Sequence, residues 1–118
     1  MRTDADRLSD ILLAIAKIRE RAAVSLDAFE QDEMLQVWVI HHLQVIGEAA
    51  RAVSQGVRDR RPEVQWPQIV ALRNILVHEY FGLNLHQVWT MVQKDLPELE
   101  KQIQRIRAEV APDPARSG

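Results

Sequence analysis

Apolar side chains recur at intervals of three and four residues along most of the chain, and this spacing restricts the fold more than any other feature. One stripe lies within residues 8–22, and a second lies within residues 35–53. Such spacing places apolar side chains on one face of an α-helix, which can then pack against other helices. No segment shows the period-two alternation of a half-buried strand, and no Asn-Gly hairpin turn occurs. The pattern predicts an all-α protein.

The first two helices are bounded by recognisable start and stop signals. Thr3 or Asp4 is suited to cap the first helix, because a side-chain oxygen at that position accepts a hydrogen bond from the first turn. The second helix is expected to run from about residue 31 to residue 54. Gln55-Gly56 would end it, since glycine readily adopts the left-handed conformation found after many helices.

Three more helices are expected in the second half of the chain. Trp66-Pro67 begins a helix that should end near Tyr80, because proline suits the first helical turn and a glycine follows at 82. Two spacings resemble capping boxes and predict the starts of a short fourth helix and a longer fifth helix: Asn84 with Gln87, and Asp95 with Glu98. Together these elements predict an antiparallel bundle of four to five helices.

Length and composition are those of one intracellular domain. The 118 residues predict a bundle over 1–110, followed by a flexible C-terminal tail, "APDPARSG", over 111–118. Cysteine is absent, which excludes disulfides and thiolate metal sites. No apolar run approaches the roughly 18 residues of a membrane helix, and the N-terminus carries acids instead of a signal peptide. We therefore expect a cytoplasmic protein without membrane association.

The net charge of −2 argues against a globally basic nucleic-acid-binding protein, but the charge is uneven. Residues 51–73 contain five arginines and two acidic residues, which gives +3 locally and leaves −5 for the rest of the chain. This local excess is compatible with phosphate contact. The simpler interpretation of any single arginine there is a solvated loop residue.

The stretch "RNILVHEY", residues 73–80, carries Arg73, Asn74, His78 and Tyr80 within an otherwise apolar segment. Histidine exchanges protons near neutral pH, with an unperturbed pKa of about 6.5. Arginine offers a planar, permanently charged fork that matches phosphate oxygens. RNA carries its own nucleophile, the ribose 2′-OH, so this pair of groups is suited to phosphodiester cleavage without a metal.

A regular helix would not gather these four side chains into one small pocket. Asn74 and His78 would form an i,i+4 pair and Tyr80 would share the face of Arg73, so the polar set would span roughly 160°. A partner surface or an irregular helix end is needed to complete such a site. A purely structural role is also open, because arginine and histidine in the last turns of a helix offset the negative end of its dipole.

The segment "LRNILVHEYFG" resembles the R-X4-H-X-Y motif of the HepT-like toxins in the HEPN superfamily. Further blocks are similar to the family as well: "VIGEAAR" at 45–51, "WPQIVALRN" at 66–74 and "VWTMVQKDLPELEKQI" at 88–103. The resemblance covers about residues 5–107. The three-residue motif together with its flanking blocks is a far more specific signal than an arginine and a histidine at that spacing alone.

This resemblance implies a function and a set of partners. Similar proteins are small all-α homodimers in which the motif of each subunit faces a cleft at the dimer interface. They act as toxins of type VII toxin–antitoxin systems and cleave transfer or messenger RNA without a metal or other cofactor. The implied antitoxin is an MntA-like nucleotidyltransferase that transfers AMP to Tyr80. By the same resemblance, His78 is the general acid/base, Arg73 binds the scissile phosphate and Asn74 is a supporting polar residue.

Other polar residues have less specific signals. Glu48, in "GEAA", is a further candidate catalytic residue that would orient a histidine or pair with an arginine. It would otherwise be a partly buried residue paired with a local base. His41 and His42 point about 100° apart on a helix, so they are unsuited to bind one metal and are expected at the surface or an interface. His86 is expected to be exposed. No metal site is predicted, because Gly82 stands where an H-E-x-x-H motif requires its second histidine.

Two non-enzymatic functions remain open from the sequence. The first is a non-catalytic bundle that binds nucleotide, or the nucleotidyltransferase, as a regulatory subunit. The second is a helical interaction module in which the polar motif only caps a helix. RNA cleavage would exclude both.

Overall fold

The computed structural model describes residues 2–75 and 84–110. In that part of the chain the regular elements are helical and no strand occurs, so the all-α prediction is confirmed. The helices are α1 (Asp4–Arg21), α2 (Leu26–Gln31), α3 (Glu33–Ala52), α4 (Gln55–Asp59), α5 (Trp66–Ala71), the 3₁₀ turn η1 (Leu72–Asn74), α6 (Leu85–Thr90), the π-helical segment η3 (Met91–Asp95) and α7 (Leu96–Glu109).

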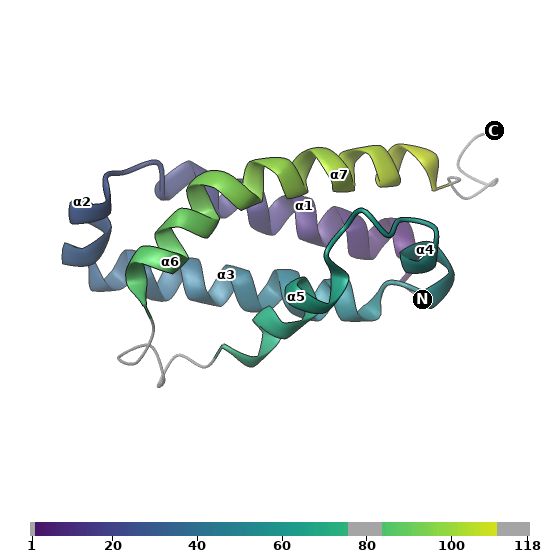
Figure 1. Ribbon diagram of the computed structural model, residues 1–118, viewed down its shortest axis with the longest axis horizontal. Helices are drawn as coiled ribbons and strands as arrows, with labels where there is room; N and C mark the ends of the chain where they lie inside the picture. Colours follow the sequence, from purple (N-terminus) through teal and green to yellow (C-terminus); the bar gives the residue numbers. More distant parts are fainter. Residues whose placement is uncertain (1, 76–83, 111–118) are drawn as a thin grey trace.

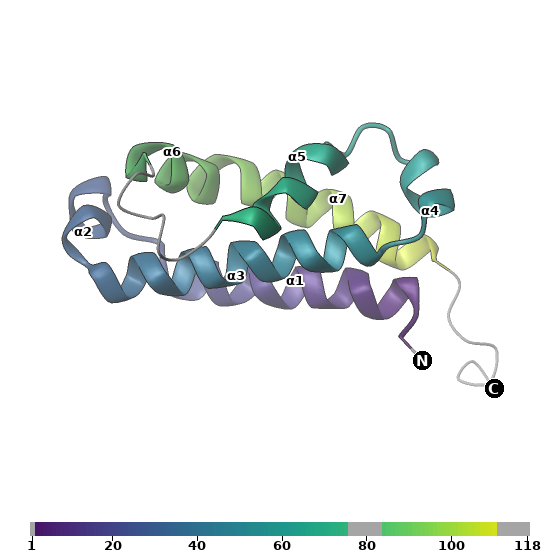
Figure 2. The ribbon, with the colours of Figure 1, turned by 90° about the horizontal axis from the view of Figure 1, so that it is seen from below.

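Three long helices form the core. Helix α1 packs against both α3 and α7, and it runs in the opposite direction to each of them (Figure 1). Helix α5 and η1 lie on α3 and not on α1 (Figure 2). The apolar stripes predicted for the first two helices face one another here. Ile103 on α7 is fully buried, as are six large members of these stripes: Leu8, Ile11, Ile15, Ile18, Leu43 and Ile46. Burying one such side chain stabilises the fold by about 1.5–3 kcal/mol.

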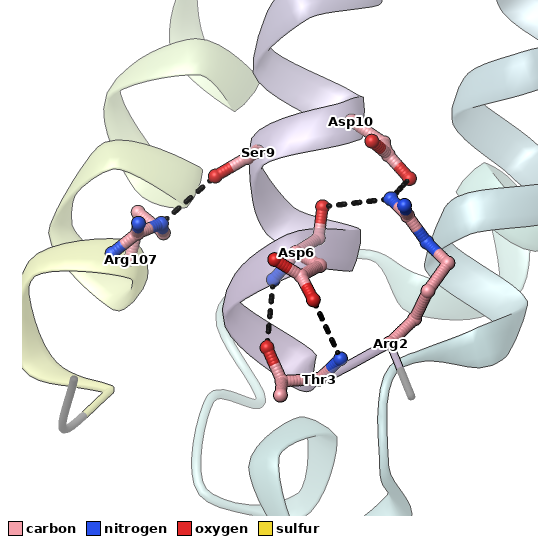
Figure 3. Close-up of polar contacts among 6 residues, drawn as sticks. All are labelled: Arg2, Thr3, Asp6, Ser9, Asp10 and Arg107. Carbon is pink, nitrogen blue, oxygen red and sulfur yellow. Dashed lines mark hydrogen bonds and ion pairs between the residues drawn. The ribbon is translucent and has the colours of Figure 1, made fainter. Parts of the chain in front are cut away.

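Helix α1 begins with the predicted cap. Thr3 Oγ1 accepts a hydrogen bond from the Asp6 backbone N–H at 3.1 Å, and the Asp6 carboxylate accepts one from the Thr3 N–H at 2.9 Å (Figure 3). This reciprocal capping box satisfies two backbone donors at the helix start. Arg107 on α7 donates to Ser9 Oγ at 2.9 Å and ties the far end of α7 to the same part of α1 (Figure 3).

The second helix ends two residues earlier than predicted, and Gly56 does not end it. Helix α3 ends at Ala52 because Ser54 starts a new helix, α4, and accepts a hydrogen bond from the Val57 N–H. The carboxylate of Asp4 holds this turn by accepting from both the backbone N–H and the hydroxyl of Ser54. Gly56 lies inside α4 with a negative φ, so its conformational freedom is not used.

The last helix starts at Leu96 as predicted, with Asp95 at its N-cap position, but the predicted capping box is absent. Asn84 caps α6 as expected, accepting from the Gln87 N–H at 3.1 Å, but the side chain of Asp95 caps nothing. Instead η3 joins α6 to α7 without a break. The buried residues Val88, Val92 and Leu96 are four apart, and successive four-residue steps drift by about 40° on an α-helix. The wider π turn takes up this drift and keeps the stripe facing the core.

None of the helices in the described part of the chain has the length and apolar composition required to span a bilayer.

Candidate functional site

The polar motif begins where a helix ends early. Trp66 starts α5 as predicted, is buried, and donates its indole N–H to the Arg61 carbonyl at 3.0 Å. Helix α5 then tightens into η1, and the backbone leaves the helical region at Ile75, with φ −75° and ψ 108°. The prediction of one continuous helix to Tyr80 is therefore wrong, since the helical path already stops at Asn74.

Gly47 determines how closely this turn approaches α3. A Cβ atom at Gly47 would lie 2.4 Å from the Arg73 backbone nitrogen and 3.0 Å from the carbonyl oxygen of Ile69 and the carbonyl carbon of Leu72. All three contacts are with backbone, which cannot move aside as a flexible side chain can. Only glycine permits this crossing, because every other residue would place an atom in the space that η1 occupies.

The close crossing places Arg73 beside Glu48 of α3. One Glu48 carboxylate oxygen lies 3.8 Å from Arg73 Nη1, and the other lies 3.5 Å from Nη1 of Arg51, one helical turn further along α3. We call Glu48, Arg51 and Arg73 the Glu48 cluster. The three side chains are 62%, 56% and 36% exposed, respectively. The cluster is thus a solvent-facing pair of guanidinium groups bridged by one carboxylate, with one positive charge in excess.

The sequence suggests either a histidine or an arginine as the partner of Glu48, and the structure shows arginines. Glu48 is also exposed instead of partly buried. Asn74 is exposed in the same turn as Arg73. His78 and Tyr80 lie outside the described residues, so their predicted roles beside Arg73 stay predictions.

The prediction for His42 is wrong, whereas those for His41 and His86 agree with their exposure. His42 is only 6% exposed, with its ring centroid 4.5 Å from that of Trp38 and 4.9 Å from that of His41. Its Nε2 atom has no hydrogen-bond partner among the described residues. Burial lowers the pKa of His42 below its usual value, and the nearby charges of His41 and Lys17 act in the same direction. His42 is therefore a neutral core residue at neutral pH.

The arginines of residues 51–73 do not form one continuous basic patch. Arg61 forms an ion pair with Glu109 of α7, and Arg58 donates to the side-chain oxygen of Gln55 at 3.1 Å. Of the five arginines in this stretch, Arg51 and Arg73 are the two for which the described residues show a shared partner, the carboxylate of Glu48. The packing of η1 on α3 thus brings two of the five arginines onto one carboxylate, while Arg60 is exposed elsewhere on the surface.

Within the described ranges, no group of three or more histidine or acidic side chains is arranged to hold a metal ion.

Comparison with known proteins identifies the family of this chain. The family described as "Ribonuclease HepT-like" matches residues 11–106. This chain belongs to the HepT-like family. The match includes α3, α5 and η1, and so it covers the whole Glu48 cluster as well as the motif at 73–80. The resemblance inferred from the sequence is confirmed.

Curated relatives carry ribonuclease names. A "Putative RNase" of Caldanaerobacter subterraneus subsp. tengcongensis is 35% identical over 107 residues, which is 90% of this chain and 96% of the relative. A "Probable ribonuclease HepT" of Thermococcus cleftensis is 32% identical over 90% of this chain and 97% of its own length. A "Putative RNase" of Methanocaldococcus jannaschii is 36% identical over 70% of this chain and 76% of the relative. No solved structure gave a significant match.

Two residues of this site were not expected from the sequence. The sequence analysis counts Arg51 only as part of the local positive charge, although its i,i+3 spacing from Glu48 is a signal for an ion pair. Gly47 lies in the middle of a helix, where glycine costs about 1 kcal/mol relative to alanine and so indicates close packing or function. Neither signal says which element approaches α3 at that point.

Proposed function

We propose that this protein is a metal-independent endoribonuclease that cleaves transfer or messenger RNA as the toxin of a type VII toxin–antitoxin system. Membership of the HepT-like family and the ribonuclease names of its relatives support the reaction class. The observation that carries the proposal is the position of Arg73. Its guanidinium group faces solvent at the start of the motif, on a turn whose backbone is fixed against Gly47. The absence of cysteine is in keeping with action in the cytoplasm.

In the proposed reaction, the ribose 2′-oxygen attacks the adjacent phosphorus atom and the bond to the 5′-oxygen breaks. His78 removes the 2′-hydroxyl proton, and a proton is delivered to the leaving 5′-oxygen. The products are a 2′,3′-cyclic phosphate and a 5′-hydroxyl. Arg73 stabilises the negative charge that develops on the phosphate oxygens, and Asn74 supports this site as a polar neighbour. General acid–base catalysis contributes about 10²–10⁴-fold, and preorganised charge contributes a similar factor.

We further propose that two copies of the chain assemble around the site. Even a regular helix would place Arg73 and His78 about 140° apart, and the helix already breaks at Ile75, so one helix face does not bring these two groups together. A second subunit is a source of the groups needed to complete an open, solvent-facing site. Mixing Arg73→Gln chains with His78→Ala chains tests this idea, because shared sites would recover cleavage in the mixture. Two inactive variants that stay inactive when mixed would contradict a shared site.

The proposed antitoxin is an MntA-like nucleotidyltransferase that attaches AMP to Tyr80. An added phosphate group near Arg73 would neutralise its charge and occupy the space of an RNA phosphate. Co-expression with such an enzyme is expected to increase the mass of the protein by AMP units, as measured by mass spectrometry. The Tyr80→Phe variant should stay unmodified, and the same added mass on that variant would contradict modification at Tyr80.

The decisive experiment for the reaction is RNA cleavage in the presence of a chelator. The wild-type protein is expected to cleave RNA and leave cyclic phosphate ends, whereas His78→Ala is expected to lose cleavage. His86→Ala is the matched control, because His86 is an exposed histidine on α6. Cleavage that survives in His78→Ala would exclude the proposed role of His78. A wild-type protein that binds the nucleotidyltransferase but cleaves no RNA would favour the regulatory-subunit function instead.

A further inference from the structure

The Glu48 cluster contains a second guanidinium group that the proposed reaction does not use. Arg51 is on α3, whereas Arg73 is on η1, and the two meet only because Gly47 lets these elements touch. Each of their Nη1 atoms lies against a different oxygen of the same carboxylate. The two cations therefore stand no further apart than one carboxylate can bridge, and both are open to solvent.

The contacts within the cluster are loose enough to be exchanged. At 3.5 and 3.8 Å, both exceed the roughly 2.7–2.9 Å of a strong charge-assisted hydrogen bond. Exposed ion pairs of this kind contribute little to stability, because water competes for both partners. A phosphate oxygen has the same charge and the same geometric match to a guanidinium fork as the carboxylate oxygen that it would replace.

The two arginines differ in what fixes them. The position of Arg73 depends on the crossing of η1 over α3, while Arg51 extends from the last turn of a regular helix. A cation in the last turn of α3 also offsets the helix dipole. That role requires no second arginine from another element, and it leaves the shared carboxylate unexplained. Two cations held close together by separate elements are instead suited to bind the regularly repeated phosphates of a nucleic-acid strand.

We propose that Arg51 binds the RNA phosphate next to the one contacted by Arg73, and that Glu48 is a positioning residue that holds both guanidinium groups until RNA replaces it. This inference rests on the proposed ribonuclease function and adds a second phosphate subsite to it. Arg51 contacts a phosphate that does not react. Its contribution is therefore the same in the bound substrate and in the transition state, and it affects binding more than the chemical step.

The test is the salt dependence of RNA binding. A fluorescein-labelled RNA 12-mer with 2′-O-methyl groups, which cannot undergo internal attack, is titrated with full-length protein at several salt concentrations and followed by fluorescence anisotropy. Each phosphate neutralised on a single strand contributes about −0.7 to the slope of log affinity against log salt. Arg51→Gln is expected to make the slope shallower by about 0.7 and to weaken binding about tenfold. Arg51→Lys should keep the wild-type slope.

Arg105→Gln is the matched control for charge, because Arg105 is an exposed arginine on α7. It is expected to keep the wild-type slope. With a cleavable RNA, Arg51→Gln should raise KM with little change in kcat. Glu48→Gln should bind RNA more tightly, because the competing carboxylate is gone, and should lower KM with little change in kcat, because RNA has already replaced the carboxylate when cleavage occurs. An ion pair with a purely structural role would not change KM while leaving kcat nearly the same.

The failures of the two proposals are distinguishable. If RNA is bound and cleaved but Arg51→Gln and Arg105→Gln have the same slope, the role of Arg51 is overturned and the ribonuclease function stands. The positioning role of Glu48 is overturned if Glu48→Gln leaves both KM and kcat unchanged. If the wild-type protein neither binds nor cleaves RNA, the proposed function fails, and the phosphate subsite fails with it.

Discussion

The α1–α3–α7 core and the α5–η1 segment are both helical, yet different physical effects determine their geometry. The core is held by apolar side chains that repeat with the helical period and are almost completely buried. The α5–η1 segment also buries Trp66, Ile69 and Leu72 against this core, but one backbone crossing at Gly47 limits how it approaches α3, and its site side chains are exposed. The long helices therefore provide most of the buried core, while the α5–η1 segment presents an open, charged surface. The two regions should respond differently to substitution.

The largest effect on stability is expected in the core. Leu43 is fully buried on α3, so Leu43→Ala should lower the free energy of unfolding by about 2–5 kcal/mol, through lost burial and the cavity left behind. Denaturation in urea measures this change. Leu13→Ala is the control, because Leu13 is 57% exposed on α1 and its loss should change stability by no more than about 0.5 kcal/mol. Equal effects of the two substitutions would contradict the account of the core.

The next largest effect is expected at the crossing between the two regions. Gly47→Ala places a Cβ atom against the backbone of η1, so it should destabilise the protein by about 1–3 kcal/mol. It should also slow RNA cleavage by on the order of 10²-fold, because Arg73 is displaced. Thermal unfolding and cleavage assays measure the two changes.

Gly56→Ala is the matched control for the crossing. The nearest atom to a Cβ there is a side-chain nitrogen of Arg60 at 3.7 Å, and φ is not positive. This substitution should stabilise the protein by about 0.4–1 kcal/mol, because alanine restricts the unfolded chain more than glycine does. If Gly47→Ala is tolerated as well as Gly56→Ala, close packing at Gly47 does not position the turn.

A smaller, pH-dependent effect is expected at His42 in the core. Its lowered pKa means that the unfolded chain takes up a proton near pH 6.5 while the folded protein does not. The unfolded state then binds more protons, so the free energy of unfolding should fall as the pH falls from about 6.5 toward the lower pKa of the folded state. His42→Phe removes this titration and should show a weaker decline between pH 7.5 and pH 5. Parallel pH profiles for the two proteins would exclude His42 as a source of acid sensitivity.

The smallest effect on stability is expected at Glu48. Its contacts with Arg51 and Arg73 are long and solvent-exposed, so Glu48→Gln should change the free energy of unfolding by less than about 1 kcal/mol. Urea denaturation at low and at moderate salt measures this change. A loss as large as that of Leu43→Ala would mean that the α5–η1 segment is held by charge, and the contrast between the two regions would not hold.

The predictable part of this molecule is the part governed by periodicity. The stripes of α1 and α3 follow directly from the sequence, Thr3 is one of the two caps considered for α1, and Asn84 is indicated as a cap by Gln87 three residues away. Arg73 was identified by its motif. Contacts between distant segments could not be read in the same way. The early helix end at Ile75 and the burial of His42 depend on which elements pack together, and the π turn at η3 resolves a conflict between spacing and burial.

The central claim is that Arg73, fixed on η1 beside α3, stabilises the charge on the scissile RNA phosphate. The most direct test is the single-turnover cleavage rate of an end-labelled RNA, in chelator, by wild-type protein, Arg73→Gln and the control Arg105→Gln. Loss of a preorganised charge contact predicts a rate about 10²–10³-fold lower for Arg73→Gln, with its melting temperature and the control rate unchanged. A folded Arg73→Gln protein that cleaves within about twofold of the wild-type rate, far short of that loss, would contradict the claim.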